Sequence, residues 1–238
     1  MAKRLRLDKW LSHSGQGSRK EVRDLCRQGR VLVNGEICRD GAQLVETGVD
    51  RVQVDRQPVC YEEFYYIMLH KPCGVISATT DAACRTVLDF LPPSCRTGGV
   101  FPVGRLDKDT TGLLLLTNDG VWAHRILSPK KHCYKVYEAT VSGSIPEDLT
   151  VRFASRIVLA DGTVCLPARA LRIDGQTVEI TVYEGRYHQV KRMCAAVGLQ
   201  VLSLHRRKIG ALGLDPALSP GQWRKLTEVE RELPFVNK

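Results

Sequence analysis

The chain has 238 residues, 43% of them hydrophobic, a length that suits one or two domains with a buried core. It carries 35 Lys and Arg against 26 Asp and Glu, and the formal net charge of +9 favours a polyanionic partner such as nucleic acid over an anionic membrane surface. Apolar runs such as Leu113–Leu116 are far shorter than the roughly 18 residues of a membrane span, and no apolar block follows the basic segment Met1–Leu11, so we expect neither a membrane anchor nor an export signal.

The nine cysteines stand singly, without a C-x-x-C pair of the kind that holds zinc. The phosphate-binding patterns G-x-G-x-x-G and G-x-x-x-x-G-K-[ST] do not occur either. We therefore expect reduced thiols in a cytoplasmic protein that has no cysteine-held zinc site and does not hydrolyse nucleotides.

The amino-terminal end is strongly basic. The first thirty residues hold nine basic and three acidic side chains, which amounts to two-thirds of the net charge. Within them, Leu5, Leu7, Trp10 and Leu11 form an apolar stripe at roughly helical spacing. This stripe predicts a first helix, which the glycine-rich segment 14–17 interrupts.

A second helix and a hairpin follow. Ser18 begins the helix because Glu21, three residues on, completes a capping box, and Gly29 suits its end. The Asn-Gly pair at 34–35 predicts a hairpin, since both residues tolerate positive φ. Two helices and a hairpin resemble the S-four-like RNA-binding domain over about residues 4–55, although a solvated charged helix face is the simpler alternative. By that resemblance, six side chains would face RNA, mainly its phosphates: Arg4, Lys9, Ser18, Arg19, Lys20 and Arg23.

Segment 55–63 is polar and turn-prone, and its Pro58 cannot donate to a strand ladder. We expect a linker there and place the domain boundary near Tyr61. An RNA-binding domain would then occupy residues 1–60 and a catalytic domain residues 61–238.

The rest of the chain consists of short β-branched and aromatic segments separated by turns. Helices are expected only at about 121–127 and 187–197. The pattern predicts an α+β fold, in which a small N-terminal α/β domain precedes a mixed, mainly antiparallel β-sheet flanked by helices.

Asp107 lies between two predicted strands. The strand-like segment 98–104 leads towards it, the polar stretch Lys108–Thr111 follows it, and 112–119 has the apolar character of a buried strand. Loops on a rigid sheet commonly carry reactive groups, but an acidic residue before a strand is also ordinary turn chemistry. This stretch alone leaves both interpretations open.

Three separated motifs narrow the choice. They are G-R-L-D-x-x-T-x-G-L-L from Gly104 to Leu114, "HCYKVYEATV" at 132–141 and "EGRYHQVKRM" at 184–193. In this order they resemble the motifs of pseudouridine synthases that share one catalytic aspartate. "LHRRKIG" at 204–210 and the ending "LSPGQWRKLTEVE" at 218–230 make the chain similar to the RsuA family, which modifies one uridine of small-subunit ribosomal RNA.

The resemblance implies three catalytic residues. Asp107 would be the essential carboxylate, Tyr137 would stack on a uracil turned out of the RNA, and Lys191 would pair with Asp107, because a buried carboxylate stays ionised only beside a cation. The reaction moves the ribose from nitrogen 1 to carbon 5 of uracil, and therefore requires no metal or redox cofactor. Whether Asp107 adds to the base, adds to the ribose or removes a ribose proton stays open. A core tyrosine and a lysine on an outer helix face are the simpler alternatives.

A uridine stacked in folded RNA must be extruded before it can react. Arg105 and Arg186 are candidates for contacting the RNA around it, with plain surface charge as the alternative. Segment 185–208 adds a second basic patch, since it holds six basic and no acidic side chains.

These features predict an rRNA pseudouridine synthase, an isomerase that acts on small-subunit (16S) rRNA or an assembling small-subunit particle and works as a monomer. Two alternatives are the same chemistry on large-subunit rRNA or tRNA, and a non-catalytic rRNA-binding assembly factor.

Overall fold

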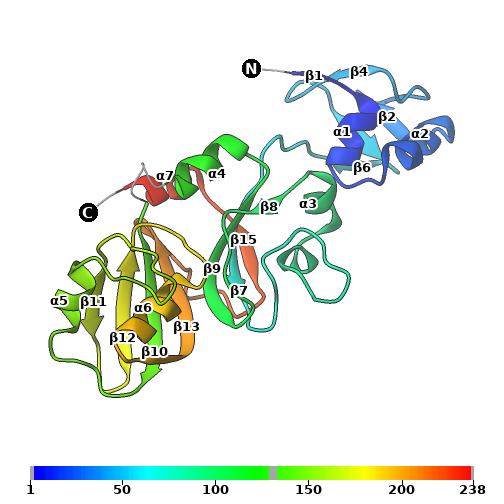
Figure 1. The fold of residues 1–238 in the computed structure, drawn as a ribbon. Helices are drawn as coiled ribbons and strands as arrows, with labels where there is room; N and C mark the ends of the chain where they lie inside the picture. The colour runs from blue at the N-terminus through cyan, green and yellow to red at the C-terminus, as the bar shows by residue number, and fades with distance from the viewer. Residues whose placement is uncertain (1–2, 129–132, 237–238) are drawn as a thin grey trace. The chain divides into compact units, whose positions relative to one another are not determined.

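The computed structural model describes residues 3–128 and 133–236, so His132 of the second motif lies outside the described residues. The chain forms two compact units, each seen in Figure 1. The N-terminal unit comprises Met1–Tyr65 and Leu91–Phe101, and the C-terminal unit comprises Tyr66–Phe90 and Pro102–Lys238. No helix in the described part of the chain is long and apolar enough to cross a membrane.

Helices and strands of the N-terminal unit share one core. Helices α1 (Leu7–His13) and α2 (Arg19–Arg27) pack together, and their buried side chains meet those of β2 and β5. One antiparallel sheet has the order β3-β2-β5-β6, and β1 pairs separately with β4. The strands are β1 (Arg4–Arg6), β2 (Val31–Val33), β3 (Glu36–Ile37), β4 (Leu44–Glu46), β5 (Val52–Val54) and β6 (Gln57–Val59).

The predictions of the second helix and of the hairpin are confirmed. The Ser18 hydroxyl accepts a hydrogen bond from the Glu21 N–H, and the Glu21 carboxylate accepts one from the Ser18 N–H, which completes the capping box. Gly29, with φ of +73°, follows the end of the helix. Asn34 and Gly35 both have positive φ and join β2 to β3.

The first helix begins at Leu7 rather than at Leu5. Leu5 belongs to β1, where it is buried between two exposed arginines and pairs with Val45 of β4. Buried and exposed side chains alternate with a period of two in a strand. The predicted stripe therefore included one strand residue, Leu5, together with the true helix positions Leu7, Trp10 and Leu11, and this placed the helix start too early.

The expectation of a linker from residue 55 was wrong for residues 55–59. Asp55 and Arg56 form the turn of a hairpin, both with positive φ, and β6 follows directly. Pro58 pairs with Gln53 because β6 is an edge strand of its sheet, where a missing N–H costs no ladder bond. The N-terminal unit also extends beyond residue 60 and includes 91–101, whose short helix α3 (Pro93–Thr97) contacts α1.

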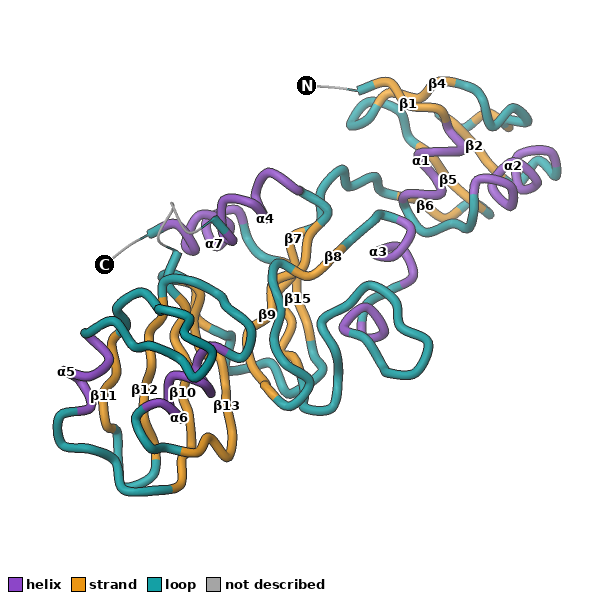
Figure 2. The backbone as a smooth tube through the Cα atoms, in the orientation of Figure 1, coloured by secondary structure: helices purple, strands orange, loops and turns teal. Residues whose placement is uncertain are grey.

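The C-terminal unit is built on a nine-stranded sheet with the path β11-β12-β10-β13-β9-β7-β15 (Figure 2). Among its described pairs, β9 and β13 run parallel and the others antiparallel, which confirms the mixed, mainly antiparallel α+β fold. The strands are β7 (Tyr66–Lys71), β8 (Phe101–Pro102), β9 (Thr110–Thr117), β10 (Lys135–Ser142), β11 (Arg169–Arg172), β12 (Thr177–Val182), β13 (Gln200–Ile209), β14 (Leu212–Gly213) and β15 (Trp223–Lys225).

The two predicted helices of this unit are confirmed as α4 (Gly120–Leu127) and α6 (Gln189–Ala196). The expectation that no others occur was wrong. Each additional helix is a short turn of three to six residues, too brief to show helical periodicity in the sequence. Among the described residues of this unit they are η1 (Val87–Phe90), α5 (Leu149–Ala154), α7 (Glu228–Glu232) and η3 (Leu233–Phe235).

Gly112 allows β9 and β13 to approach each other. Its φ is +107°, and a Cβ atom there would overlap the backbone oxygen of Arg206 and lie 2.7 Å from the Arg206 nitrogen. We expect Gly112→Ala to lower the free energy of unfolding of this unit by about 3 kcal/mol or more, as measured by urea denaturation. Gly74→Ala, with positive φ but nothing near its Cβ position, is the control and should lose only about 1 kcal/mol. Equal losses in the two variants would contradict the steric explanation.

Candidate active site

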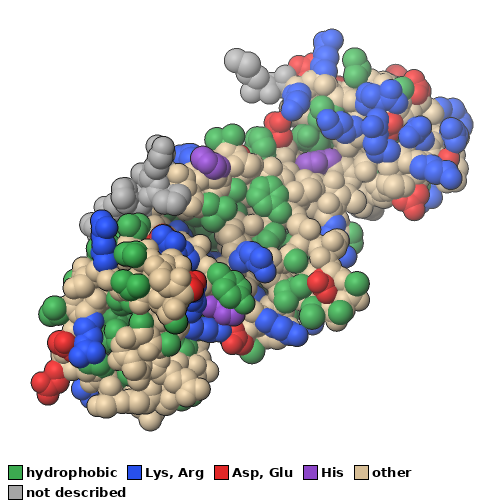
Figure 3. Space-filling model, viewed as in Figure 1, with side chains coloured by type: hydrophobic (Ala, Val, Ile, Leu, Met, Phe, Trp, Pro, Cys, Tyr) green, Lys and Arg blue, Asp and Glu red, His purple; other side chains and the backbone are tan. Residues whose placement is uncertain are grey.

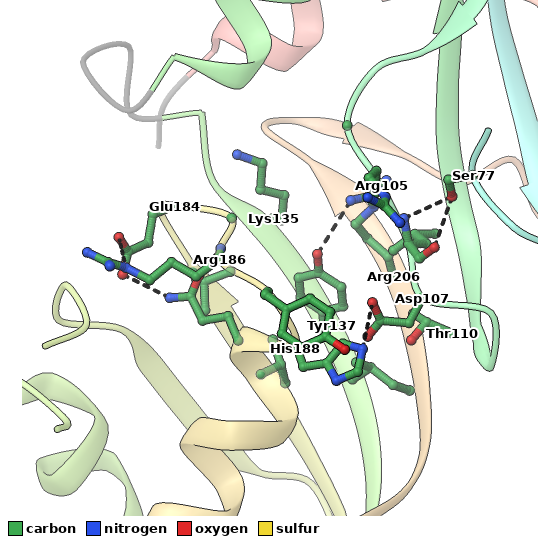
Figure 4. A pocket seen from close by; sticks show the side chains of 18 of the residues that line it. Ser77, Arg105, Asp107, Thr110, Lys135, Tyr137, Glu184, Arg186, His188 and Arg206 are labelled. Carbon is green, nitrogen blue, oxygen red and sulfur yellow. Dashed lines mark hydrogen bonds and ion pairs between the residues drawn. The ribbon is translucent and has the colours of Figure 1, made fainter. Parts of the chain in front are cut away.

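A cavity of about 680 Å³ opens in the C-terminal unit. It is lined by the loop before β9, by β10 and β13, and by the segment that leads into α6. The three sequence motifs all contribute to it. Figure 4 shows Asp107, Tyr137 and His188 lying close together, whereas Lys135 stands farther along the wall.

Asp107 is held on a loop whose backbone is fixed on both sides. The buried hydroxyl of Ser77 donates to the Leu106 carbonyl at 2.9 Å and accepts from the Leu106 N–H at 3.0 Å. The Thr110 N–H donates to the Asp107 carbonyl at 3.0 Å. The Asp107 side chain is 28% exposed, so its carboxylate is partly shielded yet open to the cavity.

Two basic side chains face this carboxylate. Lys191 Nζ lies 3.6 Å from Asp107 Oδ2, and His188 Nε2 lies 3.5 Å from Asp107 Oδ1. The structure therefore brings the expected Lys191–Asp107 pair together. The shorter contact of Lys191, however, is the 2.6 Å hydrogen bond to Asp109, and this bond lowers the pKa of the Asp109 carboxyl.

Tyr137 of β10 lines the cavity and contacts Arg206 of β13. Arg206 Nη1 donates to the Tyr137 hydroxyl at 3.4 Å, and Arg206 Nε donates to the Leu113 carbonyl at 2.8 Å. The guanidinium carbon is 5.9 Å from the centroid of the Tyr137 ring. Arg206 is only 4% exposed, so the tyrosine hydroxyl meets a buried cation.

The segment before α6 forms another side of the cavity. His188 has a left-handed backbone with φ of 47°, and its ring is stacked on Tyr187 with 3.8 Å between centroids. Tyr187 is 75% exposed. Arg186 lines the cavity and forms a 2.9 Å ion pair with Glu184, while Arg105 is exposed at the opposite wall.

Lys71 lies behind the Asp107 loop and is completely buried at the end of β7. Its ammonium group donates to the carbonyls of Thr110 at 2.8 Å, Pro72 at 3.1 Å and Lys108 at 3.4 Å. It therefore ties β7 to both ends of the loop segment 108–110. Burial lowers the pKa of Lys71 to about 8.

This pKa predicts a pH dependence of stability. Below about pH 8, Lys71 is charged in the folded and unfolded chains alike; between about 8 and 10.5 only the unfolded chain holds the extra proton. The stability that depends on Lys71 should therefore rise with pH through this window, by about 3 kcal/mol in total. Urea denaturation at pH 7.5 and pH 10 should show this gain in the unchanged protein relative to Lys71→Met. A constant difference between the two proteins would refute it.

The RNA-binding candidates of the basic end all belong to the N-terminal unit, whereas the cavity residues all belong to the C-terminal unit. Lys and Arg side chains gather on the face of the N-terminal unit seen in Figure 3. The buried Asp8 carboxylate holds Arg19 at 2.9 Å and Arg23 at 3.6 Å. Arg4 pairs with Glu46 at 3.5 Å, and Ser18 caps α2; Lys9 and Lys20 are exposed.

Sequence reasoning missed several residues of the cavity region, among them Ser77, Asp109, His188 as a neighbour of Asp107, and Arg206. Only Arg206 had a usable signal. Alternation along β13 places it on the same face as buried Leu204, whereas Arg207 points away and pairs with Glu138. Within residues 3–128 and 133–236, no group of three or more His, Cys, Asp and Glu side chains could hold a metal ion.

Comparison with known proteins matches both units. Residues 65–196 match the RNA pseudouridylate synthase family, and residues 5–50 match the S4 domain. The chain is 46% identical over 233 residues to "Uncharacterized RNA pseudouridine synthase YtzG" of Bacillus subtilis, which covers 96% of this chain and 98% of that protein. It is 42% identical over 230 residues to "Ribosomal small subunit pseudouridine synthase A" of Escherichia coli, covering 95% of this chain and 98% of that one.

A solved structure, "Crystal structure of pseudouridylate synthase", is 39% identical in sequence and superposes with a TM-score of 0.69 over 97% of this chain and 99% of that chain. The match therefore extends through both the fold and the sequence. Together with the cavity around Asp107, these similarities confirm the assignment made from the three motifs. The chain belongs to the RNA pseudouridylate synthase family and carries an S4 domain at its amino-terminal end.

Proposed function

We propose that the protein converts one specific uridine of small-subunit ribosomal RNA into pseudouridine. The observation that carries this proposal is the Asp107 carboxylate, which lies on a loop in a cavity with Lys191 and His188 beside it. Support for the substrate comes from relatives named for the ribosomal small subunit, which resemble this chain over nearly its full length.

The reaction is an isomerisation whose atoms balance without a co-reactant. The bond from ribose carbon 1 to base nitrogen 1 breaks, the uracil turns, and a new bond joins ribose carbon 1 to base carbon 5. The proton on carbon 5 is lost, and nitrogen 1 gains one. Asp107 supplies the carboxylate for the first stage, as a nucleophile or as a base.

Other residues in and beside the cavity fit the remaining tasks. The Tyr137 ring lines the cavity and offers a stacking surface for an extruded uracil, and its hydroxyl is the candidate group for moving the proton from carbon 5. Lys191 balances the charge of Asp107 at 3.6 Å. Exposed Arg105 can fill the gap left in the RNA or hold a neighbouring phosphate, and Arg186 can contact the strand at the other wall.

We assign residues 1–60 to RNA docking and 61–238 to catalysis, in a cytoplasmic enzyme that works as a monomer without a cofactor. The docking residues are Arg4, Lys9, Ser18, Arg19, Lys20 and Arg23. Asp8 supports this role because it holds two of these arginines in place on the surface. Basic side chains on both units then give the RNA two points of attachment.

The test is to map pseudouridine by carbodiimide labelling and primer extension. Small-subunit RNA, large-subunit RNA and partly assembled small subunits are each incubated with the protein or with its Asp107→Asn variant. The proposal expects one new stop in small-subunit RNA that the variant does not produce. A stop in large-subunit RNA would keep the chemistry and overturn the substrate, and no stop in any RNA would favour a binding factor.

The docking role predicts a salt effect. Lys20 is exposed and has no ion-pair partner among the described residues, so its contact with RNA would be made to phosphate. We expect Lys20→Ala to weaken binding of all RNAs alike and to reduce the slope of log affinity against log salt by about 1. Arg152→Ala, which removes an exposed arginine paired with Asp148, should leave the slope unchanged. Filter-binding titrations at several salt concentrations measure both slopes.

A further inference from the structure

Arg206 combines burial with an unpartnered donor. Its Nε and Nη1 atoms are bound by Leu113 and Tyr137, but Nη2 has no hydrogen-bond partner among the described residues although it is shielded from solvent. No carboxylate of the described residues forms an ion pair with Arg206. A guanidinium can only donate, so this atom needs an acceptor that the part of the chain described by the structure does not supply.

The Thr110 hydroxyl is a second buried polar group in the same cavity. Thr110 is 1% exposed, and its hydroxyl has no hydrogen-bond partner within residues 3–128 and 133–236, whereas its backbone groups are bound to Asp107 and Lys71. Thr110 lies opposite Leu204, two positions before Arg206, where β9 and β13 run side by side. Both side chains line the cavity that contains Asp107.

Unsatisfied buried polar groups are costly, and a charged group is more costly than a neutral one. Two such groups on adjacent strands beside the reactive carboxylate indicate that a ligand completes their hydrogen bonds. This step rests on the proposed function, which places a uracil in the cavity. We propose that Arg206 Nη2 donates to oxygen 4 of that uracil, and that the Thr110 hydroxyl makes a second contact with the same base.

The geometry at Tyr137 favours the base over a phosphate. Arg206 lies beside the Tyr137 ring, with 5.9 Å between the guanidinium carbon and the ring centroid, and reaches its hydroxyl. A uracil stacked on that ring would turn its edge, with its oxygens, towards the guanidinium. Cytosine carries an amino group in place of oxygen 4, and two donors would then face each other.

The symmetry of uracil adds a consequence for the reaction. Turning the base about the axis through nitrogen 3 and carbon 6 exchanges nitrogen 1 with carbon 5, and it also exchanges oxygen 2 with oxygen 4. A donor fixed at one carbonyl position therefore finds an oxygen there both before and after the turn. Arg206, anchored by its bond to the Leu113 carbonyl, can hold substrate and product alike.

The test measures discrimination between uridine and cytidine at the mapped target position. All proteins carry Asp107→Asn so that binding is measured without turnover. We expect Thr110→Val and Arg206→Lys each to reduce the preference for the uridine RNA about 10- to 100-fold, mainly by weakening binding of that RNA. Thr110→Val removes an unsatisfied hydroxyl without changing side-chain shape, so the free protein should be as stable as before or more stable.

Thr117→Val is the control from the same strand. Its hydroxyl accepts from the Asp119 N–H at 3.0 Å, so this variant should lose stability and keep the preference for uridine. Unchanged discrimination in folded Thr110→Val and Arg206→Lys would overturn the inference, and so would equal weakening for uridine, cytidine and abasic RNA, which indicates a phosphate contact. Absence of pseudouridine with the unchanged enzyme would instead overturn the proposed function and this inference with it.

Discussion

Replacing Asp107 by asparagine is expected to abolish pseudouridine formation and to leave RNA affinity within about twofold of its original value. Asparagine has nearly the same shape, but its amide cannot act as a nucleophile or a base. Loss of a residue that makes or breaks bonds typically lowers kcat by about 10⁴-fold or more. The loop itself should survive the change, because Ser77 and Thr110 hold it through backbone atoms rather than through the carboxylate.

Single-turnover assays on the mapped RNA measure the rate, and filter binding measures the affinity. Asp148→Asn is the matched control, since its exposed carboxylate pairs with Arg152 far along the chain from the cavity loop. It should keep full activity. Measurable turnover by Asp107→Asn at more than about one-hundredth of the original rate would remove Asp107 from the central role. Strong loss of RNA affinity would instead assign it to binding.

The sequence predicted part of this site, because the residue types that the chemistry needs stand in recognisable motifs. Asp107, Tyr137 and Lys191 each fall in a motif, and the sheet brings β9, β10 and the start of α6 to one cavity. The capping box at Ser18 and the Asn-Gly turn also predicted their helix and hairpin correctly. In both cases one or two residues determine the local structure, by binding the free N–H groups at the helix start or by adopting the positive φ of the turn.

Other parts of the structure depend on tertiary context. The edge position of β6 tolerates Pro58, and no local pattern shows which strand is an edge. The position of Lys191 between two carboxylates depends on side-chain rotamers, which motif spacing does not fix. Arg206 stands in a run of basic residues typical of a surface, yet the alternation of β13 turns it inwards.

Lys191 provides the second large expected effect. Its ammonium group lies between the carboxylates of Asp107 and Asp109, at 3.6 Å and 2.6 Å. Lys191→Met would leave two neighbouring negative charges without this cation, in a partly buried site. We expect kcat to fall about 10²- to 10³-fold, because the negative charge that develops on the uracil beside Asp107 loses a nearby positive charge, while KM changes little. Arg152→Met, which removes an exposed cation, should leave kcat unchanged.

The Asp109→Asn variant then shows whether the effect of Lys191 on activity depends on its contact with Asp107 or on its contact with Asp109. If Lys191 acts on Asp107, the variant keeps most of its activity, since the ammonium group loses a competing partner and needs to move only about 1 Å to reach hydrogen-bond distance of Asp107. If Lys191 acts mainly by holding the loop through Asp109, the variant loses as much activity as Lys191→Met. Single-turnover rates of the two variants and their double mutant separate these cases, because residues in one ion-pair network give non-additive losses.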